Sequence, residues 1–232
     1  MIKGFEKRPA EFAENVKKAA ESGDIDALAE KARKEREPVS AYAAVYLAVR
    51  KGLGVTPFDS QIIAGGYLDD ENAVELATGE GKTIAAVFAA FMSVCRGEHI
   101  HILTFNDYLA KRDREWMKPV YDLLGVNTAY ITEKTSHDER KSAYRADVLY
   151  TTVKECGFDF LRDFLVFDPA DAVGNGYERV IVDEADSLLI DEARIPLIAA
   201  GVMDIEKDAE LPEVFEFARS LEEGDYDTDE GS

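Results

Sequence analysis

The sequence predicts an α/β protein in which a mainly parallel sheet has helices on both faces and follows a helical N-terminal segment. From Asn72 onward, short apolar runs alternate with amphipathic stretches. This alternation is typical of strands that are buried on both faces and joined by helices. Before that point, apolar residues recur at helical spacing. No stretch approaches the roughly 18 consecutive apolar residues of a membrane span.

Residues 1–52 are expected to form the helical N-terminal segment. Pro9 marks the start of a first helix, and the Ser-Gly-Asp sequence at residues 22–24 ends it. A second short helix is expected to run to about Arg36. Pro38 then opens an alanine-rich helix that ends in two glycines, because proline suits the first turn of a helix and glycine its C-terminal cap.

The α/β part is expected over residues 53–203. Its strands are predicted at Ala73–Leu76, Ile100–Thr104, Thr128–Ile131, Val148–Thr151, Val180–Val182 and Leu197–Ala200. The intervening helices are predicted at Lys82–Cys95, Tyr108–Leu124, Asp138–Tyr144 and Phe158–Phe164. Trp116 is expected to be a core anchor of the second of these helices, because aromatic side chains bury large areas.

Charge and cysteine content narrow the possible functions. The formal net charge is −20, and residues 203–232 carry 12 acids against two bases. This balance argues against a large nucleic-acid-binding surface, because phosphate contacts require Lys and Arg. The two cysteines are too few for a disulfide framework. A reducing cytoplasm therefore fits best.

A glycine-rich turn carries the first candidate chemistry. Its sequence retains the Gly-x-Gly-Lys-Thr part of a P-loop, although the strict pattern requires glycine where Leu76 stands. Glycines let successive backbone N–H groups point at a phosphate chain, and the following helix adds its positive dipole end. The Lys82 ammonium is expected to reach the β- and γ-phosphates, and the Thr83 hydroxyl to bind magnesium. The predicted nucleotide-binding residues here are Thr78, Gly79, Glu80, Gly81, Lys82 and Thr83.

An acidic strand end supplies the second half of the candidate site. The apolar strand at Val180–Val182 delivers Asp183 and Glu184 to its carboxyl end, where ligands of open α/β sheets bind. Asp183 is expected to hold magnesium, usually through water, and Glu184 to orient or deprotonate the attacking water. Each motif alone is also typical of a plain glycine turn or a helix N-cap. Their pairing favours an ATP and Mg²⁺ site with Lys82, Asp183 and Glu184 as catalytic residues.

Longer segments resemble one particular family. Residues 57–66 (PFDSQIIAGG) resemble a Q-type motif that reads adenine through the amide of Gln61. Residues 104–117 (TFNDYLAKRDREWM), 156–163 (CGFDFLRD) and 182–198 (VDEADSLLIDEARIPLI) follow in order. Together these strings, which are far more specific than a P-loop, closely resemble the SecA preprotein translocase ATPases.

The resemblance implies a RecA-like P-loop NTPase domain that binds adenine near Gln61, phosphates at Gly79–Thr83 and magnesium near Asp183. Arg112 resembles a family position near the nucleotide. Hydrolysis is implied between this domain and a second RecA-like domain that brings an arginine finger. Further implied partners are preprotein substrate and a membrane protein-conducting channel, with homodimerisation possible for the parent protein. The implied location is cytoplasmic, peripherally associated with the inner face of the cell membrane.

The sequence also departs from the family pattern. Residues 152–156 read TVKEC where the family usually reads TNNEF, and Ala185 stands where members commonly carry Val. These departures favour a divergent or accessory SecA-like ATPase. The domain over 53–203 is expected to be incomplete, and residues 204–232 to be an acidic tail or the start of a preprotein-binding insertion. Without the second domain, the region is expected to bind nucleotide weakly and hydrolyse it slowly.

Two other classes of protein share part of this pattern. A DEAD-box RNA helicase also has a P-loop, a Gln61-type amide and the DEAD string at residues 183–186. It predicts RNA-stimulated ATP hydrolysis, whereas the acidic balance and the GFDFLRD string count against it. A nucleotide-sensing adaptor predicts tight ATP binding without turnover.

Overall fold

The computed structural model describes residues 8–174 and 176–197, all within a compact unit, Met1–Leu197. Four strands form one sheet in the order β2-β3-β1-β4. Their bounds are β1 Ile100–Thr104, β2 Thr128–Tyr130, β3 Val148–Thr152 and β4 Arg179–Val182. All three pairings are parallel, and Ile102 of β1 pairs with Tyr150 on one side and Ile181 on the other. The parallel sheet confirms the predicted α/β class.

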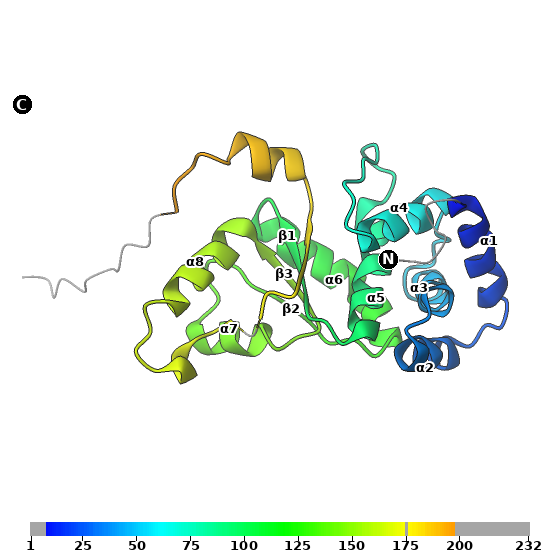
Figure 1. Cartoon of the computed structure of the whole chain (residues 1–232), viewed down its shortest axis with the longest axis horizontal. Helices are drawn as coiled ribbons and strands as arrows, with labels where there is room; N and C mark the ends of the chain where they lie inside the picture. The colour runs from blue at the N-terminus through cyan, green and yellow to red at the C-terminus, as the bar shows by residue number, and fades with distance from the viewer. Residues whose placement is uncertain (1–7, 175, 198–232) are drawn as a thin grey trace, which may run out of the picture. The chain divides into compact units, whose positions relative to one another are not determined.

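The N-terminal segment folds as the three predicted helices, α1 (Pro9–Ala20), α2 (Ile25–Glu35) and α3 (Pro38–Leu53). The side chain of Glu37 caps α3 by accepting from the backbone N–H groups of Val39 and Ser40, at 2.9 and 2.7 Å. Figure 1 shows α3 between α1, α2 and α5. The middle of α3 is accordingly almost wholly buried.

Helix α4 (Asp59–Asp69) was not predicted as a helix from the sequence. Its Gly65 packs so closely against α5 (Lys82–Arg96) that an added Cβ would lie 2.6 Å from the Cβ of Phe88. Glycine disfavours helices in isolation, and α4 has little amphipathic periodicity because several sides of it are buried. Tertiary packing therefore stabilises this helix where local propensity does not.

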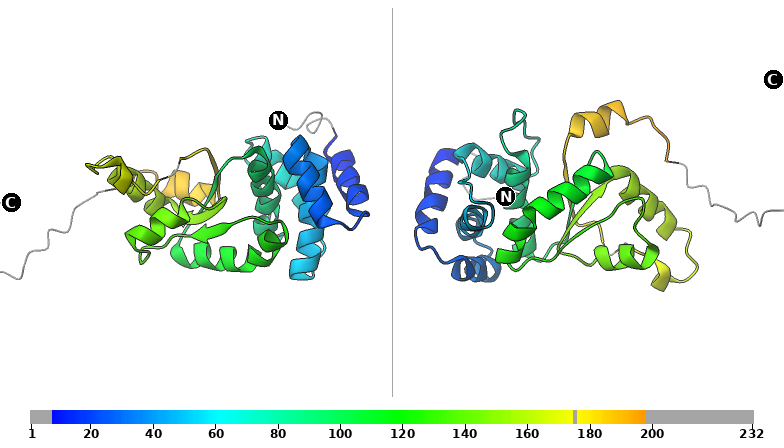
Figure 2. Two further views of the ribbon diagram at one scale, coloured as in Figure 1. Left: turned by 90° about the horizontal axis from the view of Figure 1, so that it is seen from below. Right: turned by 180° about the vertical axis from the view of Figure 1, so that it is seen from behind.

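Helices cover both faces of the sheet (Figure 2). Helices α5 and α6 (Asp107–Leu123) pack on one face, where Val148 and Tyr150 join the main core. Helices α7 (His137–Ala143) and α8 (Val153–Asp163) pack on the other, where Leu149 meets Tyr144 in a second cluster. The alternation of neighbouring residues between the two faces is the period-2 geometry of a strand.

The strand predicted at Ala73–Leu76 is wrong, because residues 72–77 form no regular element. Both edges of β1 are already paired, and this segment lies across a cavity from β4. A ladder requires neighbouring strands about 4.8 Å apart, and the cavity separates this segment from β4. The strand predicted at Leu197–Ala200 lies outside the described residues beyond Leu197, as does the predicted tail at 204–232. The domain boundaries at 52 and 203 stay predictions.

Buried charges link three elements beside the sheet. The carboxylate of Asp69, at the end of α4, accepts from the Arg96 guanidinium of α5 at 2.6 Å. Arg179 of β4 donates to the backbone carbonyl of Asp69 and lies 3.7 Å from its carboxylate. Because Asp69 is 2% exposed, these contacts are weakly screened by solvent. They fix α4, α5 and β4 relative to one another.

Trp116 does not anchor the core as predicted, since it is 47% exposed on α6. The buried residues of α6 recur at helical spacing, at positions 110, 113, 117, 120 and 121, and Trp116 lies off that stripe. Across the described residues, no helix has both the length and the apolar character that crossing a membrane requires.

Candidate functional site

A cavity of about 910 Å³ lies between β4 and the segment at residues 71–76. The residues that line it include Lys82, Thr83, Asp183 and Glu184. Lys82 and Thr83 open α5, whereas Asp183 and Glu184 follow the last residue of β4. The structure therefore brings these four predicted site residues together at the carboxyl end of the parallel sheet, where open α/β folds bind ligands.

The glycine turn has the backbone that its sequence predicts. Gly79 and Gly81 have φ values of 88° and 80°, in the left-handed region that residues with a Cβ avoid. The turn is closed by a hydrogen bond from Glu80 N to the carbonyl oxygen of Ala77, at 3.1 Å. Gly81 directly precedes α5, so the positive end of a 15-residue helix begins at Lys82. This arrangement favours an anion such as phosphate.

The acidic strand end carries local backbone strain. Glu184 has φ 54°, which is uncommon for a residue with a Cβ. The backbone of Asp183 continues the β-ladder by donating to Leu103 O at 2.9 Å, and its carboxylate accepts from Glu184 N at 3.0 Å. A π-helix, Ser187–Asp191, follows directly. Strained residues and π-helical turns recur at functional sites, so both features mark this turn as more than a structural cap.

Gln61 contacts the phosphate turn and is not among the residues that line the cavity. Its amide nitrogen donates to the carbonyl oxygen of Glu80 at 2.7 Å, and its amide oxygen accepts from Phe58 N at 3.1 Å. A Cβ at Gly81 would lie 2.3 Å from the Gln61 nitrogen. Glycine at position 81 is therefore required both by the left-handed backbone and by the close approach of Gln61.

Arg112 also lies outside the cavity lining but pairs with a residue that belongs to it. Its Nε and Nη2 atoms lie 2.8 and 2.7 Å from Asp113 Oδ1, and its guanidinium lies 5.9 Å from the centre of the Tyr108 ring. Asp113 is 2% exposed and lines the cavity. Burial raises the pKa of Asp113, Arg112 opposes that rise, and the charge of Asp183 adds to it.

Asp113 is a cavity residue that the sequence analysis does not single out. The spacing of apolar residues in α6 indicates that Asp113 is buried. Position 113 lies three residues after Ala110 and four before Met117, both buried. A carboxylate on the apolar stripe of an amphipathic helix faces the sheet rather than solvent.

The donor set of the cavity fits Mg²⁺. The Thr83 hydroxyl and the Asp183 carboxylate are oxygen ligands of the kind that this cation takes. No group of three or more His, Cys, Asp or Glu side chains within 8–174 and 176–197 is arranged to hold a metal ion. Mg²⁺ commonly keeps several waters and shares the oxygens of a phosphate ligand, so two protein oxygens are compatible with its binding.

The all-parallel sheet, the helices on both its faces and the cavity at its carboxyl end place the domain in the RecA-like class of α/β proteins. The sequence model of the SecA DEAD-like domain matches residues 5–230. The chain therefore belongs to the SecA DEAD-like domain family.

Similar proteins include three that are named as subunits of the protein translocase. The SecA subunit from Wolbachia sp. subsp. Brugia malayi (strain TRS) is 44% identical over 192 residues, 83% of this chain and 22% of the relative. The SecA 2 subunit from Thermobifida fusca (strain YX) is 46% identical over 185 residues, 79% and 24% of the two chains. The Mycobacterium avium (strain 104) SecA subunit is 40% identical over 221 residues, 94% and 28%. The chain thus spans about a quarter of the length of these relatives.

Proposed function

We propose that this chain is the first nucleotide-binding region of a SecA-type ATPase, which couples ATP hydrolysis to the transport of preproteins across a membrane. The observation that carries the proposal is the cavity shared by Lys82, Thr83, Asp183 and Glu184. These side chains come from two elements distant in sequence and together offer a cation, a hydroxyl and two carboxylates. The names of the relatives as protein translocase subunits support the transport role.

Each group has a distinct role in the proposed site. The backbone N–H groups of Gly79 and Gly81 and the Lys82 ammonium bind the phosphates. The Thr83 hydroxyl and the Asp183 carboxylate hold Mg²⁺, which when bound offsets the negative charge of the phosphates. Glu184 orients or deprotonates the attacking water. Phosphoryl transfer depends mainly on such positioning and on charge stabilisation.

Gln61 and Arg112 are proposed to contact the nucleotide from outside the phosphate cavity. The Gln61 amide reads adenine while its bond to Glu80 O, at 2.7 Å, connects the adenine side of the site with the phosphate turn. Arg112, held by Asp113 at 2.7 Å, contacts the nucleotide from the rim. Both side chains already have defined partners in the described structure, so little conformational entropy is lost when they bind.

The larger assembly follows from the same proposal. A second RecA-like domain supplies an arginine finger, and preprotein and a membrane channel are the transport partners. The protein then works in the cytoplasm at the inner face of the cell membrane, and the parent protein can form a homodimer. The 232-residue chain by itself binds ATP but hydrolyses it slowly, because the transition-state charge lacks the arginine finger.

Titration with a fluorescent ATP analogue tests the site. We expect Lys82→Ala to weaken binding by about tenfold or more, because a charge-assisted contact to phosphate is lost. Lys51→Ala removes an exposed lysine from the end of α3, away from the cavity, and is the matched control. Equal affinity of the Lys82 variant and the wild-type chain would remove the central lysine from the proposal.

Steady-state ATP hydrolysis by the full-length protein tests the transport role. We expect stimulation by preprotein together with the membrane channel, and none by RNA. Stimulation by RNA with a steep salt dependence would instead identify an RNA helicase. Tight ATP binding without turnover, whichever partner is added, would identify a nucleotide-sensing adaptor.

A further inference from the structure

Asp113 is a buried acid to which the proposed mechanism gives no role beyond holding Arg112. It is 2% exposed, whereas the side chain of its partner Arg112 is 46% exposed. Burying a carboxylate is costly, and a half-exposed ion pair between adjacent residues contributes little. An exposed acid would form an ion pair with the half-exposed Arg112 equally well. The burial of Asp113 therefore calls for a role inside the cavity.

Asp113 belongs to the same cavity as the proposed phosphate site. It lies on the same stripe of α6 as the buried residues Met117 and Tyr121, which face the sheet. It lines the cavity together with Lys82, Thr83 and Asp183. Two carboxylates, Asp113 and Asp183, thus share a space that is proposed to receive a chain of phosphates.

This arrangement of charges disfavours the binding of a nucleotide that carries no divalent cation. Lys82, the end of α5 and the Arg112 guanidinium attract phosphate, whereas the two carboxylates repel it and each other. A divalent cation beside Asp183 reverses this repulsion, because it attracts both carboxylates and the phosphate oxygens. Each negative charge in the cavity therefore increases the difference in affinity between the magnesium complex of the nucleotide and the free nucleotide.

We propose that Asp113 is a positioning residue that makes nucleotide binding depend on Mg²⁺: its buried charge keeps free nucleotide out and admits the magnesium–nucleotide complex. The inference rests on the proposed ATP site, and it assigns that site a preference for the metal-bound form of its ligand. Asp113 acts through the cation at Asp183 and through Arg112, and not by contact with the reacting atoms.

The experiment compares the dissociation constant of a fluorescent ADP analogue in excess EDTA with that in millimolar Mg²⁺, using the 232-residue chain. The ratio of the two constants is the magnesium factor. We expect Asp113→Asn to lower this factor by about five- to tenfold, the effect of one unit charge several ångströms away in a partly screened site. Most of the change should come from tighter binding in EDTA. Glu115→Gln, which removes an exposed acid from the same helix, should leave the factor unchanged.

The ratio separates this role from a structural one. A variant that merely loosened α6 would weaken binding with and without Mg²⁺ alike and leave the factor unchanged, which would overturn the proposal. Asp113→Ala also removes the charge and should lower the factor in the same direction, which guards against a folding defect peculiar to one variant. If the wild-type chain binds no nucleotide in either buffer, the proposed ATP site fails and this inference fails with it.

Discussion

At the scale of single residues, His101 is a buried imidazole on the face of β1 opposite α5 and α6. Its ring meets those of Tyr144 and Tyr177 edge-on, with both pairs of ring centres 5.5 Å apart. Burial lowers the pKa of His101 from 6.5 to about 4, with a smaller contribution from His99 and an opposing one from Glu178. Because protonation must occur in an apolar site, the folded state holds this imidazole neutral.

We expect His101 to make the fold sensitive to acid. Its folded-state pKa lies below the unfolded value, so its contribution to stability is fully present above about pH 6.5 and is lost as the pH falls to about 4. The shift corresponds to about 3 kcal/mol at most. Urea unfolding at several pH values should show a smaller loss between pH 7 and 4 for His101→Gln than for the wild-type chain. His137→Gln, at an exposed position, should follow the wild type; the same behaviour from both variants would contradict the assignment.

Also at this scale, the identities of the phosphate-turn residues could be predicted from the sequence, whereas some of their surroundings could not. Glycine at positions 79 and 81 is dictated locally by backbone conformation. The exposure of Trp116 and the burial of Asp113 depend instead on which side of α6 meets the sheet. Aromatic character suggested a core position for Trp116. Burial on α6 depends instead on whether a residue lies on the stripe that faces the sheet, and Trp116 lies off that stripe.

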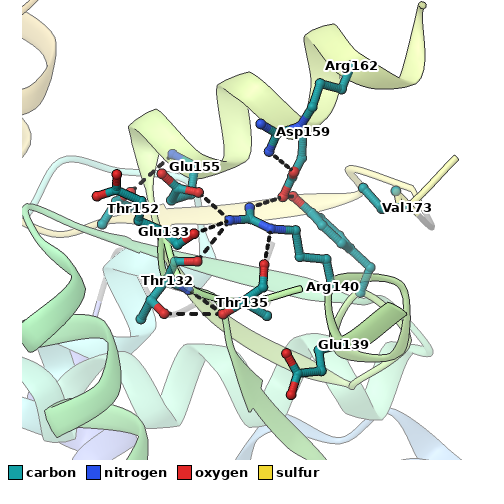
Figure 3. Close-up of polar contacts among 12 residues, drawn as sticks. Thr132, Glu133, Thr135, Glu139, Arg140, Thr152, Glu155, Asp159, Arg162 and Val173 are labelled. Carbon is teal, nitrogen blue, oxygen red and sulfur yellow. Dashed lines mark hydrogen bonds and ion pairs between the residues drawn. The ribbon is translucent and has the colours of Figure 1, made fainter. Parts of the chain in front are cut away.

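At the scale of elements, helix α8 is fixed by one buried guanidinium (Figure 3). Arg140 of α7 lies 2.6 Å from the Glu155 carboxylate and 2.9 Å from that of Asp159, both on α8. It also donates to the backbone carbonyls of Thr132 and Thr135, at 2.8 and 2.9 Å. Arg140 thereby joins α8 to the loop that follows β2.

We expect Arg140→Met to destabilise the fold by about 3–5 kcal/mol, because it leaves the buried Glu155 carboxylate without its cation and leaves Asp159 with only the half-exposed Arg162. Chemical unfolding measures the change, and hydrogen exchange should show α8 opening first. Arg145→Met removes an exposed arginine close by in the sequence and should change stability by less than about 0.5 kcal/mol. Adding Glu155→Gln to Arg140→Met should recover part of the loss; no recovery would show that the cost arises from packing alone.

Sequence pattern predicted most elements because their apolar spacing is local. Helix α4 was missed because its glycines and its burial on several sides hide the amphipathic signal. The segment Ala73–Leu76 was mispredicted for the opposite reason, since its composition suits a strand but it pairs with no strand among the described residues. A segment forms a strand only where a neighbouring strand is available for backbone hydrogen bonding, and a single sequence does not specify which segments become neighbours.

At the scale of the whole described unit, the N-terminal helices and the α/β part share one core. The rings of Tyr42 of α3 and Phe88 of α5 pack at a tilt of 32° with their centres 5.2 Å apart, and the same cluster extends to Ile102 and Tyr150 in the sheet. A continuous core of this kind favours cooperative unfolding. The helical segment is therefore expected to depend on the sheet for its stability.

We expect the fluorescence of Trp116 and the far-ultraviolet circular dichroism to report the same urea midpoint. Trp116 is the chain's single tryptophan and lies on α6 beside the sheet, whereas the dichroism sums over all helices, including α1–α3. Tyr42→Ala, which opens a void where the two parts meet, should lower both midpoints equally. Two separate dichroism transitions, only one of which matches the fluorescence, would show that the N-terminal helices fold independently.

The cavity at the end of β4 also bears on how the chain reaches its folded state. Lys82 and Glu184 stand 102 positions apart (184 − 82), and β4 takes its place in the sheet by pairing with β1 alone. Long chain closures of this kind come late, because their entropy is lost before their contacts form. Nucleotide binding measured during refolding would therefore report the last step of assembly. It would not report the earlier formation of the helices.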